Sequence, residues 1–199
     1  MAYHLYQPEA FILDEREIGE SNKIYYLLTD ELGLVIARAQ GVRLLKSKLR
    51  YHLDRYSCAR VVLVRGKENW RLVGSEKTEI YRNIFTCNQK LKSVIRVFSF
   101  LQKFIQGESP HPTLYRELKK ALVFLDELDS SMARDRTIYL WEQVVVFRLL
   151  HQLGYIRDLP KLSYFITKHN WDQEILIQAE KSSPSLIKTI NEAIEASHI

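Results

Sequence analysis

The pattern of hydrophobic and polar positions changes once along the chain, near residue 80. Before that point, short apolar or β-branched runs are bounded by charged residues and glycines, which is typical of β-strands. The runs are Ala10–Leu13, Lys23–Thr29, Leu34–Ala39, Ser57–Val64 and Trp70–Gly74. After Glu79, apolar residues recur at every third or fourth position, which predicts helices with one buried face. Strands followed by helices, without alternation, predict an α+β chain with two domains, residues 1–80 and 81–199.

Two connections between the predicted strands favour hairpins. Asp30-Glu31-Leu32-Gly33 is a tight-turn sequence in which Gly33 is free to take a positive φ. Residues 65–69 join the last two runs in the same way. The connection over residues 41–56 is longer. Five short strands with one long connection suit a small antiparallel barrel better than a sandwich.

The second half of the chain predicts a set of helices with identifiable breaks. Residues 91–105 and 114–125 each place apolar side chains on one helical face, and glycine and prolines separate them at residues 107–112. Thr137–Leu153 is apolar on nearly every face, so we expect a central buried helix that is capped by Gly154. Asp129–Ser131 is a predicted loop. Residues 159–198 predict two or three shorter helices, interrupted at Asn170 and at Ser182-Ser183-Pro184.

Composition narrows the class of protein. The chain has 199 residues, of which 46% are hydrophobic and 27% charged, as in globular proteins. It contains no run of 18 apolar residues and no signal-peptide pattern, so we expect neither membrane association nor export. Cys58 and Cys87 are too few for a zinc cluster or a disulfide framework. We therefore expect a reduced cytoplasmic protein with no metal and no cofactor.

Charge is unevenly distributed although the net charge is only +5. Between Leu32 and Lys67 the only acidic residue is Asp54. The basic residues of this stretch are Arg38, Arg43, Lys46, Lys48, Arg50, Arg55, Arg60, Arg65 and Lys67. Since acidic residues dominate the first 31 positions, the sequence predicts a local basic surface rather than a uniformly basic protein.

The long connection between the third and fourth predicted strands is the candidate binding site. Loops on a rigid barrel commonly carry ligands, and a polyanion needs cations spaced along it. The loop residues expected to contact a nucleic acid are Arg43, Lys46, Ser47, Lys48 and Arg50, with Arg38, Arg55 and Arg60 extending the patch. A solvated surface loop is the alternative interpretation of the same charges.

Four tyrosines near this loop offer stacking surfaces for unpaired bases. They are Tyr25, Tyr26, Tyr51 and Tyr56, of which Tyr25 and Tyr51 are the candidates for base stacking. Tyr25 and Tyr26 are neighbours on one predicted strand, so one of them faces inward and the other outward. A core position is the alternative for each.

Catalytic motifs are missing from the sequence. The carboxylates Asp14, Glu15, Glu17 and Glu20 cluster at a predicted strand end and its turn, without the histidine or aspartate partners that a metal-dependent nuclease needs. The chain has no phosphate-binding glycine loop, dinucleotide fingerprint or nucleophile elbow. We therefore expect no enzymatic activity, and a nuclease is the most distant of the alternatives.

Several segments, in order along the chain, resemble the RecO family of bacterial recombination mediators. The matching segments are Phe11–Leu13, Gly19–Ile24, Leu28–Leu34, Ala39–Arg43, Lys46–Arg50 and Leu149–Tyr155. Gln40 stands where the family usually has lysine. Many members carry four zinc-binding cysteines after the Leu-Gly-Tyr segment, whereas this sequence has none there and resembles a short variant.

The resemblance implies a fold and a function. The fold is an N-terminal five-stranded OB barrel followed by an all-helical domain. The function is non-enzymatic DNA repair and recombination in the bacterial cytoplasm, at the nucleoid. Such a protein binds single- and double-stranded DNA and anneals complementary strands. With RecR it assists recombinase loading onto strands coated by single-stranded-DNA-binding protein. The DNA-contacting role falls on Arg43, Lys46, Ser47, Lys48 and Arg50, and more weakly on Arg38.

Two further hypotheses belong to other classes. The first alternative to a DNA repair mediator is a protein-interaction adaptor with a degenerate OB barrel, which Gln40 and the missing cysteines favour. The second is an RNA-binding OB-fold protein. The intact basic loop opposes the first, and competition between DNA and RNA oligomers separates the second from a DNA binder.

Overall fold

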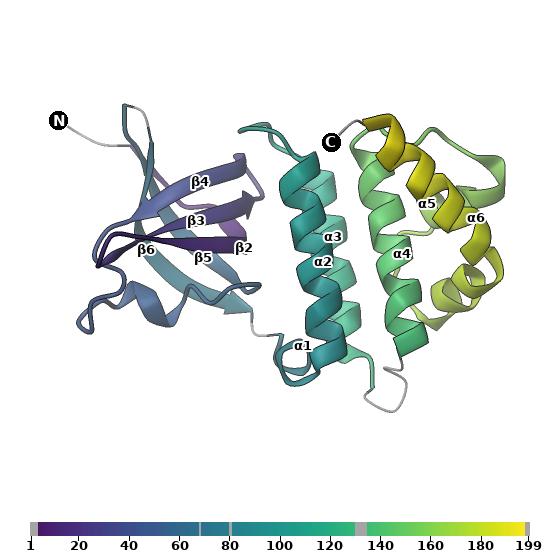
Figure 1. The fold of residues 1–199 in the computed structure, drawn as a ribbon, viewed down its shortest axis with the longest axis horizontal. Helices are drawn as coiled ribbons and strands as arrows, with labels where there is room; N and C mark the ends of the chain where they lie inside the picture. Colours follow the sequence, from purple (N-terminus) through teal and green to yellow (C-terminus); the bar gives the residue numbers. More distant parts are fainter. Residues whose placement is uncertain (1–3, 68, 80, 130–134, 198–199) are drawn as a thin grey trace. The chain divides into compact units, whose positions relative to one another are not determined.

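The computed structural model describes residues 4–67, 69–79, 81–129 and 135–197 (Figure 1). The chain divides into two compact units. The first contains Met1–Ile80 and Ile105–Pro112, and the second contains Tyr81–Phe104 and Thr113–Ile199. The segment between the first two long helices therefore groups with the strands.

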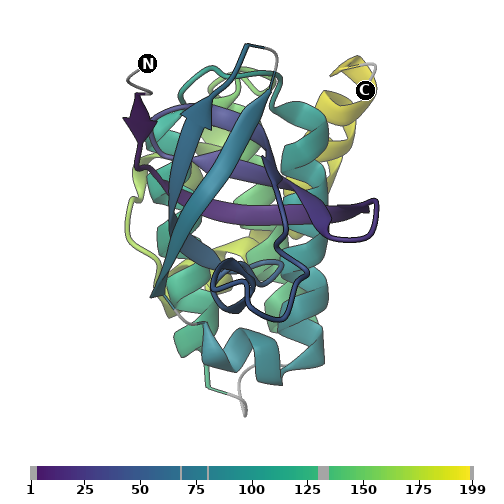
Figure 2. The ribbon, with the colours of Figure 1, turned by 90° about the vertical axis from the view of Figure 1, so that its left-hand side faces the viewer.

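The first unit is a closed β-barrel. Its strands are β1 (Leu5–Tyr6), β2 (Glu9–Ile18), β3 (Asn22–Thr29), β4 (Gly33–Ala39), β5 (Cys58–Arg65) and β6 (Trp70–Glu79). The strand order is β1-β5-β2-β3-β4-β6, and pairing of β5 with β6 closes a five-stranded barrel with β1 added to β5. Figure 2 looks onto this barrel, where β5 and β6 cross β2 and β3. The predicted OB-like barrel is confirmed.

Alternation along the strands builds the barrel core. In β4, Val35, Ala37 and Ala39 face inward while Ile36 and Arg38 face solvent, as expected for successive side chains on a strand. The inward set from all five strands forms one apolar cluster, which includes Ile12, Leu27, Val61, Leu63 and Trp70. This alternation fixes which arginines of the basic region are available at the surface.

Strand β2 is longer than the apolar pattern predicts. It continues past Leu13 to Ile18, with a bulge between Ile12 and Asp14, and pairs with β3 throughout. The placement of Asp14, Glu15 and Glu17 at a strand end and turn is therefore wrong, because they lie within β2. Pairing with β3 satisfies the backbone of this polar stretch, so it needs no apolar side chains to remain extended.

Gly33 occupies the tight turn that the sequence indicates. Its φ is +74°, a region that glycine adopts without a side-chain penalty. The turn lies against Ile105–Pro112 of the same unit, where the Leu34 amide donates to the Gly107 carbonyl at 3.2 Å. On the same segment, Glu108 accepts a hydrogen bond from the Trp70 indole at 2.8 Å. The barrel is thus held by a segment that follows it by many residues in the chain.

The second unit is helical. Its elements are α1 (Arg82–Thr86), α2 (Asn88–Phe104), α3 (Pro112–Glu127), α4 (Asp135–Gln152), the short 3-10 helix η2 (Pro160–Leu162), α5 (Ser163–Thr167) and α6 (Gln173–Ser197). Helix α4 buries Trp141, Val144 and Phe147, as its apolar pattern predicts. It ends at Gln152, two residues before Gly154, whose φ is +82°. The loop predicted at Asp129–Ser131 falls mostly outside the described residues.

The break predicted at Ser182-Ser183-Pro184 is wrong. Helix α6 runs continuously from Gln173 to Ser197 with Pro184 inside it. Leu176 and Ala179 before the proline, and Leu186 after it, are all buried. The burial of this continuous apolar face outweighs the backbone hydrogen bond that proline removes. The break at Asn170 is confirmed, because α5 ends at Thr167. Within the described residues, no helix is long and apolar enough to cross a membrane.

Candidate nucleic-acid interface

A groove on the barrel carries three basic side chains from separate parts of the chain. Arg38 comes from β4, Arg71 from β6 and Lys67 from the connection between β5 and β6. The groove has a volume of about 810 Å³. Gln40, Leu49 and Asn69 complete its rim. OB folds bind oligonucleotides over the corresponding second and third barrel strands and the last strand connection.

Strand pairing forces two of these cations together. Strands β4 and β6 pair in parallel, with Arg38 in register with Arg71. Both side chains are exposed, and no ion pair joins either of them, or Lys67, to a carboxylate of the described residues. Like charges on facing positions of neighbouring strands repel. A bound anion would remove this repulsion.

The basic connection between β4 and β5 is anchored at several points. Val42 and Leu53 are buried in the barrel core. The Gly41 amide donates to Asn22 Oδ1 at 2.9 Å, and the Arg43 amide to the Ser21 carbonyl at 3.0 Å. The connection then forms the 3-10 helix η1 (Leu49–Tyr51). This anchoring gives the basic side chains a defined platform.

The predicted contact residues of this connection differ in exposure. Lys46 and Lys48 are exposed, and Ser47 is half-buried. The side chain of Arg50 lies outside the described part of the structure. Lys46 and Lys48 thus add two available cations to the barrel unit, and the predicted contact of Ser47 with DNA stays a prediction.

Two other predicted contact residues already bind carboxylates. Arg43 pairs with Glu17 at 3.2 Å and donates to the Gly19 carbonyl. Arg55 lies 3.5 Å from Asp14 and donates to the Glu15 carbonyl at 2.6 Å. Both arginines line a second hollow of about 560 Å³ together with these glutamates. The predicted basic patch is therefore divided into a compensated hollow and the uncompensated groove of Arg38, Lys67 and Arg71.

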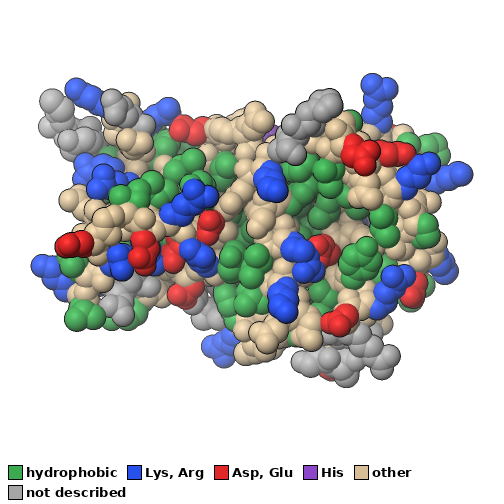
Figure 3. All heavy atoms as spheres, viewed as in Figure 1, with side chains coloured by type: hydrophobic (Ala, Val, Ile, Leu, Met, Phe, Trp, Pro, Cys, Tyr) green, Lys and Arg blue, Asp and Glu red, His purple; other side chains and the backbone are tan. Residues whose placement is uncertain are grey.

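Charged side chains of both signs lie on the face that Figure 3 shows. On the face drawn in Figure 3, lysines and arginines lie over both units with carboxylates among them. The charge of this face is mixed, so the local pairing of each cation decides which of them is available to a phosphate.

The structure separates the two candidate stacking tyrosines. Tyr25 is 1% exposed and belongs to the barrel core, so its predicted stacking on a base is wrong. Burial, together with the charge of Glu15 and a hydrogen bond to it, raises the pKa of the Tyr25 phenol far above its ordinary value. Tyr51 is 62% exposed on η1. Its stacking on a base stays a prediction.

Lys67 and Arg71 are the groove residues that sequence reasoning missed. Both follow Arg65 in or next to the second hairpin, where they look like ordinary solvated positions. Their position beside Arg38 depends on the closure of the barrel by β4 and β6, which are far apart in sequence. The only local signal is the basic stretch that ends at Lys67, in which Asp54 is the only acidic residue.

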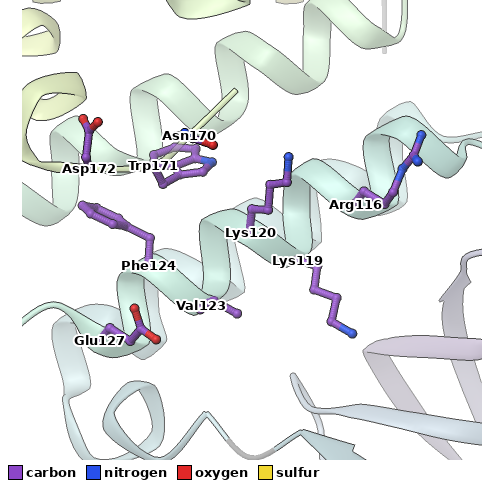
Figure 4. A pocket seen from close by; sticks show the side chains of 9 residues that line it. All are labelled: Arg116, Lys119, Lys120, Val123, Phe124, Glu127, Asn170, Trp171 and Asp172. Carbon is purple, nitrogen blue, oxygen red and sulfur yellow. The ribbon is translucent and has the colours of Figure 1, made fainter. Parts of the chain in front are cut away.

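The helical unit carries a hollow of its own, with an apolar floor and a basic rim (Figure 4). Its volume is about 760 Å³. Val123 and Phe124 of α3 and Trp171 supply the apolar surface, and α3 also supplies three cations. The cations are Arg116, Lys119 and Lys120, and Glu127 and Asp172 are the acidic residues. Asp172 pairs with Lys168 at 2.9 Å and Lys120 pairs with Glu117 at 3.2 Å, so charges of both signs on this rim are partly compensated.

The side chains of Arg148 and Phe124 contact the Trp171 ring. The buried Arg148 guanidinium lies over its ring at 4.8 Å and donates to the Phe165 carbonyl at 2.7 Å. Phe124 packs against the same ring, with centroids 5.7 Å apart. The indole Nε1 of Trp171 has no hydrogen-bond partner among the described residues. The hollow thus combines an aromatic floor with cations on α3.

The part of the chain that the structure describes contains no cluster of potential metal ligands. No three histidine, cysteine, aspartate or glutamate side chains come together there as ligands would. The carboxylates of β2 instead face the cations Lys23, Arg43 and Arg55.

Comparison with known proteins identifies related sequences for most of the chain. Residues 1–81 match the family model described as "Recombination protein O N terminal". Two proteins named "DNA repair protein RecO" from Dehalococcoides mccartyi strains are 29% identical over 91% of this chain and 30% identical over 78% of it. One of the same name from Gloeothece citriformis is 27% identical over 75%. The chain spans 66%, 59% and 51% of the lengths of these three relatives.

Proposed function

Because the chain belongs to the RecO family of DNA repair proteins, we propose that it binds single- and double-stranded DNA through the barrel groove and anneals complementary strands. The observation that carries the proposal is the pair Arg38 and Arg71, which neighbouring strands hold in register without a carboxylate partner among the described residues. Lys67 in the same groove, and Lys46 and Lys48 on the basic connection, extend the cationic surface.

Annealing follows from neutralising phosphates. Two complementary strands repel each other through their backbones, and a cationic platform that holds one strand lowers this repulsion while its bases stay accessible. Each phosphate neutralised on a single strand contributes a slope of about −0.7 in log affinity against log salt. If five cations each contact a phosphate, the slope is about −3.5. No step of this process needs a catalytic group.

Neutralising the paired arginines tests the proposal. The variant Arg38→Gln/Arg71→Gln should weaken binding of a labelled single strand at least about tenfold and flatten the salt slope by about 1.4. The same change should leave the free energy of unfolding unchanged or raise it by about 0.5 kcal/mol, because a cross-strand repulsion is removed. Fluorescence anisotropy at several salt concentrations and urea unfolding provide the two measurements.

Arg60→Gln is the matched control. Arg60 is an exposed barrel arginine that does not line the groove, and its register partner on β6 is the carboxylate residue Glu76. We expect its loss to change DNA affinity less than about twofold. If Arg60→Gln, which removes one charge, produced half or more of the double variant's change in log affinity, net charge alone would explain the effect and the groove would be removed from the proposal.

We further propose that the hollow on the helical unit binds the acidic tail of single-stranded-DNA-binding protein. The support is its combination of an aromatic floor with the cations Arg116, Lys119 and Lys120 on its rim. Such a contact would bring the annealing surface to coated strands. Family membership supports RecR as the partner in recombinase loading. A chain that binds the tail but no DNA would instead be a protein-interaction adaptor.

A further inference from the structure

The basic connection between β4 and β5 exposes two adjacent leucines at its turn. Leu45 is 85% exposed and Leu44 is 45% exposed. Leu45 has the highest exposed fraction among the large apolar side chains that the structure describes as exposed. Isolated exposed leucines are common on protein surfaces. These two, in contrast, directly precede the consecutive residues Lys46, Ser47 and Lys48 of the basic connection.

The turn that carries the leucines is fixed by its own hydrogen bonds. The Leu44 amide donates to the Gly41 carbonyl at 3.1 Å, and the Ser47 amide donates to the Leu44 carbonyl at 2.9 Å. Val42, just before the leucines, is buried in the barrel core, and Leu49, just after them, packs against the same core. The turn is therefore anchored in the barrel core by Val42 before the leucines and by Leu49 after them, whereas Leu44 and Leu45 remain exposed.

We propose that Leu45, supported by Leu44, is a wedge that enters a base step of double-stranded DNA while Lys46 and Lys48 contact the flanking phosphates. The proposal rests on the proposed DNA-binding function and adds a contact with the bases. Apolar side chains that enter a base step leave water and partly unstack the bases, and neighbouring cations hold the backbone around them. The combination of an exposed leucine and adjacent cations on a preformed turn supplies both parts.

The wedge has a consequence for strand annealing. Insertion opens one base step of a bound duplex, so the protein would loosen a mismatched pairing more easily than a matched one, because a mismatched step costs less to unstack. The cations supply most of the affinity, whereas the leucine supplies the deformation. These two contributions can be separated by measuring binding and unstacking on the same DNA.

The test uses the whole chain and a duplex that contains several 2-aminopurines, whose fluorescence rises when the base unstacks. Anisotropy of an end label reports binding in the same samples. We expect the wild-type protein to raise 2-aminopurine fluorescence on binding. Leu45→Ala should lose most of this rise while its duplex affinity stays within about threefold, because the phosphate contacts remain. Leu45→Phe should retain the rise.

Leu5→Ala is the matched control, since Leu5 is an exposed leucine of the same unit, 52% exposed on β1. It should leave both signals unchanged. A duplex bound without a rise in fluorescence, or a full rise with Leu45→Ala, would overturn the wedge and leave the DNA-binding proposal intact. A rise that Leu5→Ala removes equally would also overturn it. Absence of DNA binding by the wild-type protein would refute the proposed function itself, and the wedge with it.

Discussion

At the scale of single residues, some arginines of the barrel are paired with carboxylates of the described residues and others are not. Arg55 and Arg43 are neutralised by carboxylates of β2 and stabilise the junction of the basic connection with that strand. Arg38, on the outward face of β4, has Arg71 as its register partner. Exposed ion pairs contribute up to about 1 kcal/mol each, and repulsion costs a similar amount. An arginine without a carboxylate partner therefore lowers the stability of the barrel slightly, and a bound phosphate would restore that stability.

Tyr25 gives a prediction about pH at this scale. Because its pKa is raised in the folded protein, it keeps its proton above pH 10, whereas the unfolded chain releases it near pH 10. The native state then binds more protons than the unfolded state, so the free energy of unfolding falls as the pH rises. We expect wild type to lose about 1.4 kcal/mol relative to Tyr25→Phe between pH 9 and pH 11, measured by urea unfolding.

The control for Tyr25 is Tyr51→Phe, which alters an exposed tyrosine on η1. This variant removes a phenol hydroxyl outside the barrel core, so it separates the effect of burial from the loss of a tyrosine. A difference between wild type and Tyr25→Phe that is constant from pH 9 to pH 11 would contradict the burial of the Tyr25 hydroxyl.

At the scale of elements, the turn between β3 and β4 depends on a segment outside the strands. Gly33 and Gly19 both have positive φ values, +74° and +58°. A Cβ added at Gly33 would overlap the backbone of Ser109, whereas at Gly19 no atom lies within 4 Å. Gly19→Ala should cost about 1 kcal/mol of stability from backbone strain, and Gly33→Ala about 3 kcal/mol or more. Chemical denaturation of both variants measures the difference.

Equal losses for the two glycine variants would be the contrary result. They would mean that Ile105–Pro112 moves away from the turn without a penalty, and that its hydrogen bonds to Leu34 and Trp70 contribute little to the barrel.

The elements that the sequence predicts well are those whose burial follows a simple period. The alternation in β4 and the fully apolar helix α4 identify both elements without any knowledge of their partners. The polar end of β2 and the second half of α6 have no such local signal. Their conformations depend on pairing with β3 and on packing of the buried face beyond Pro184, which are tertiary effects.

The same distinction explains the site. The basic connection stands out in the sequence because acidic residues are missing around it. The groove does not, since Arg71 comes next to Arg38 only when the barrel closes. Nor does composition reveal that Glu17 neutralises Arg43, because the two lie on different segments. The distribution of charges along the sequence predicts which region carries a binding surface. Only the strand register shows which residues belong to that surface.

At the scale of the whole molecule, each of the two compact units carries a basic hollow of its own. The groove of Arg38, Lys67 and Arg71 belongs to the barrel unit, and the hollow around Trp171 belongs to the helical unit. The first lacks aromatic side chains in its lining, whereas the second includes Phe124 and Trp171. This difference suits a phosphate backbone on one unit and an acidic peptide with an apolar end on the other.

If the two surfaces act independently, their functions can be removed one at a time. Arg38→Glu/Arg71→Glu should weaken DNA binding more than about tenfold and leave binding of the acidic tail peptide unchanged. Arg116→Glu, at an exposed position of the helical hollow, should do the reverse, with Lys181→Glu on α6 as its matched control. On bare complementary strands only the barrel variant should fail to anneal, whereas on strands coated with single-stranded-DNA-binding protein both variants should fail. Thermal unfolding verifies that each variant is folded, and a barrel variant that is folded yet loses the peptide would refute the independence of the two surfaces.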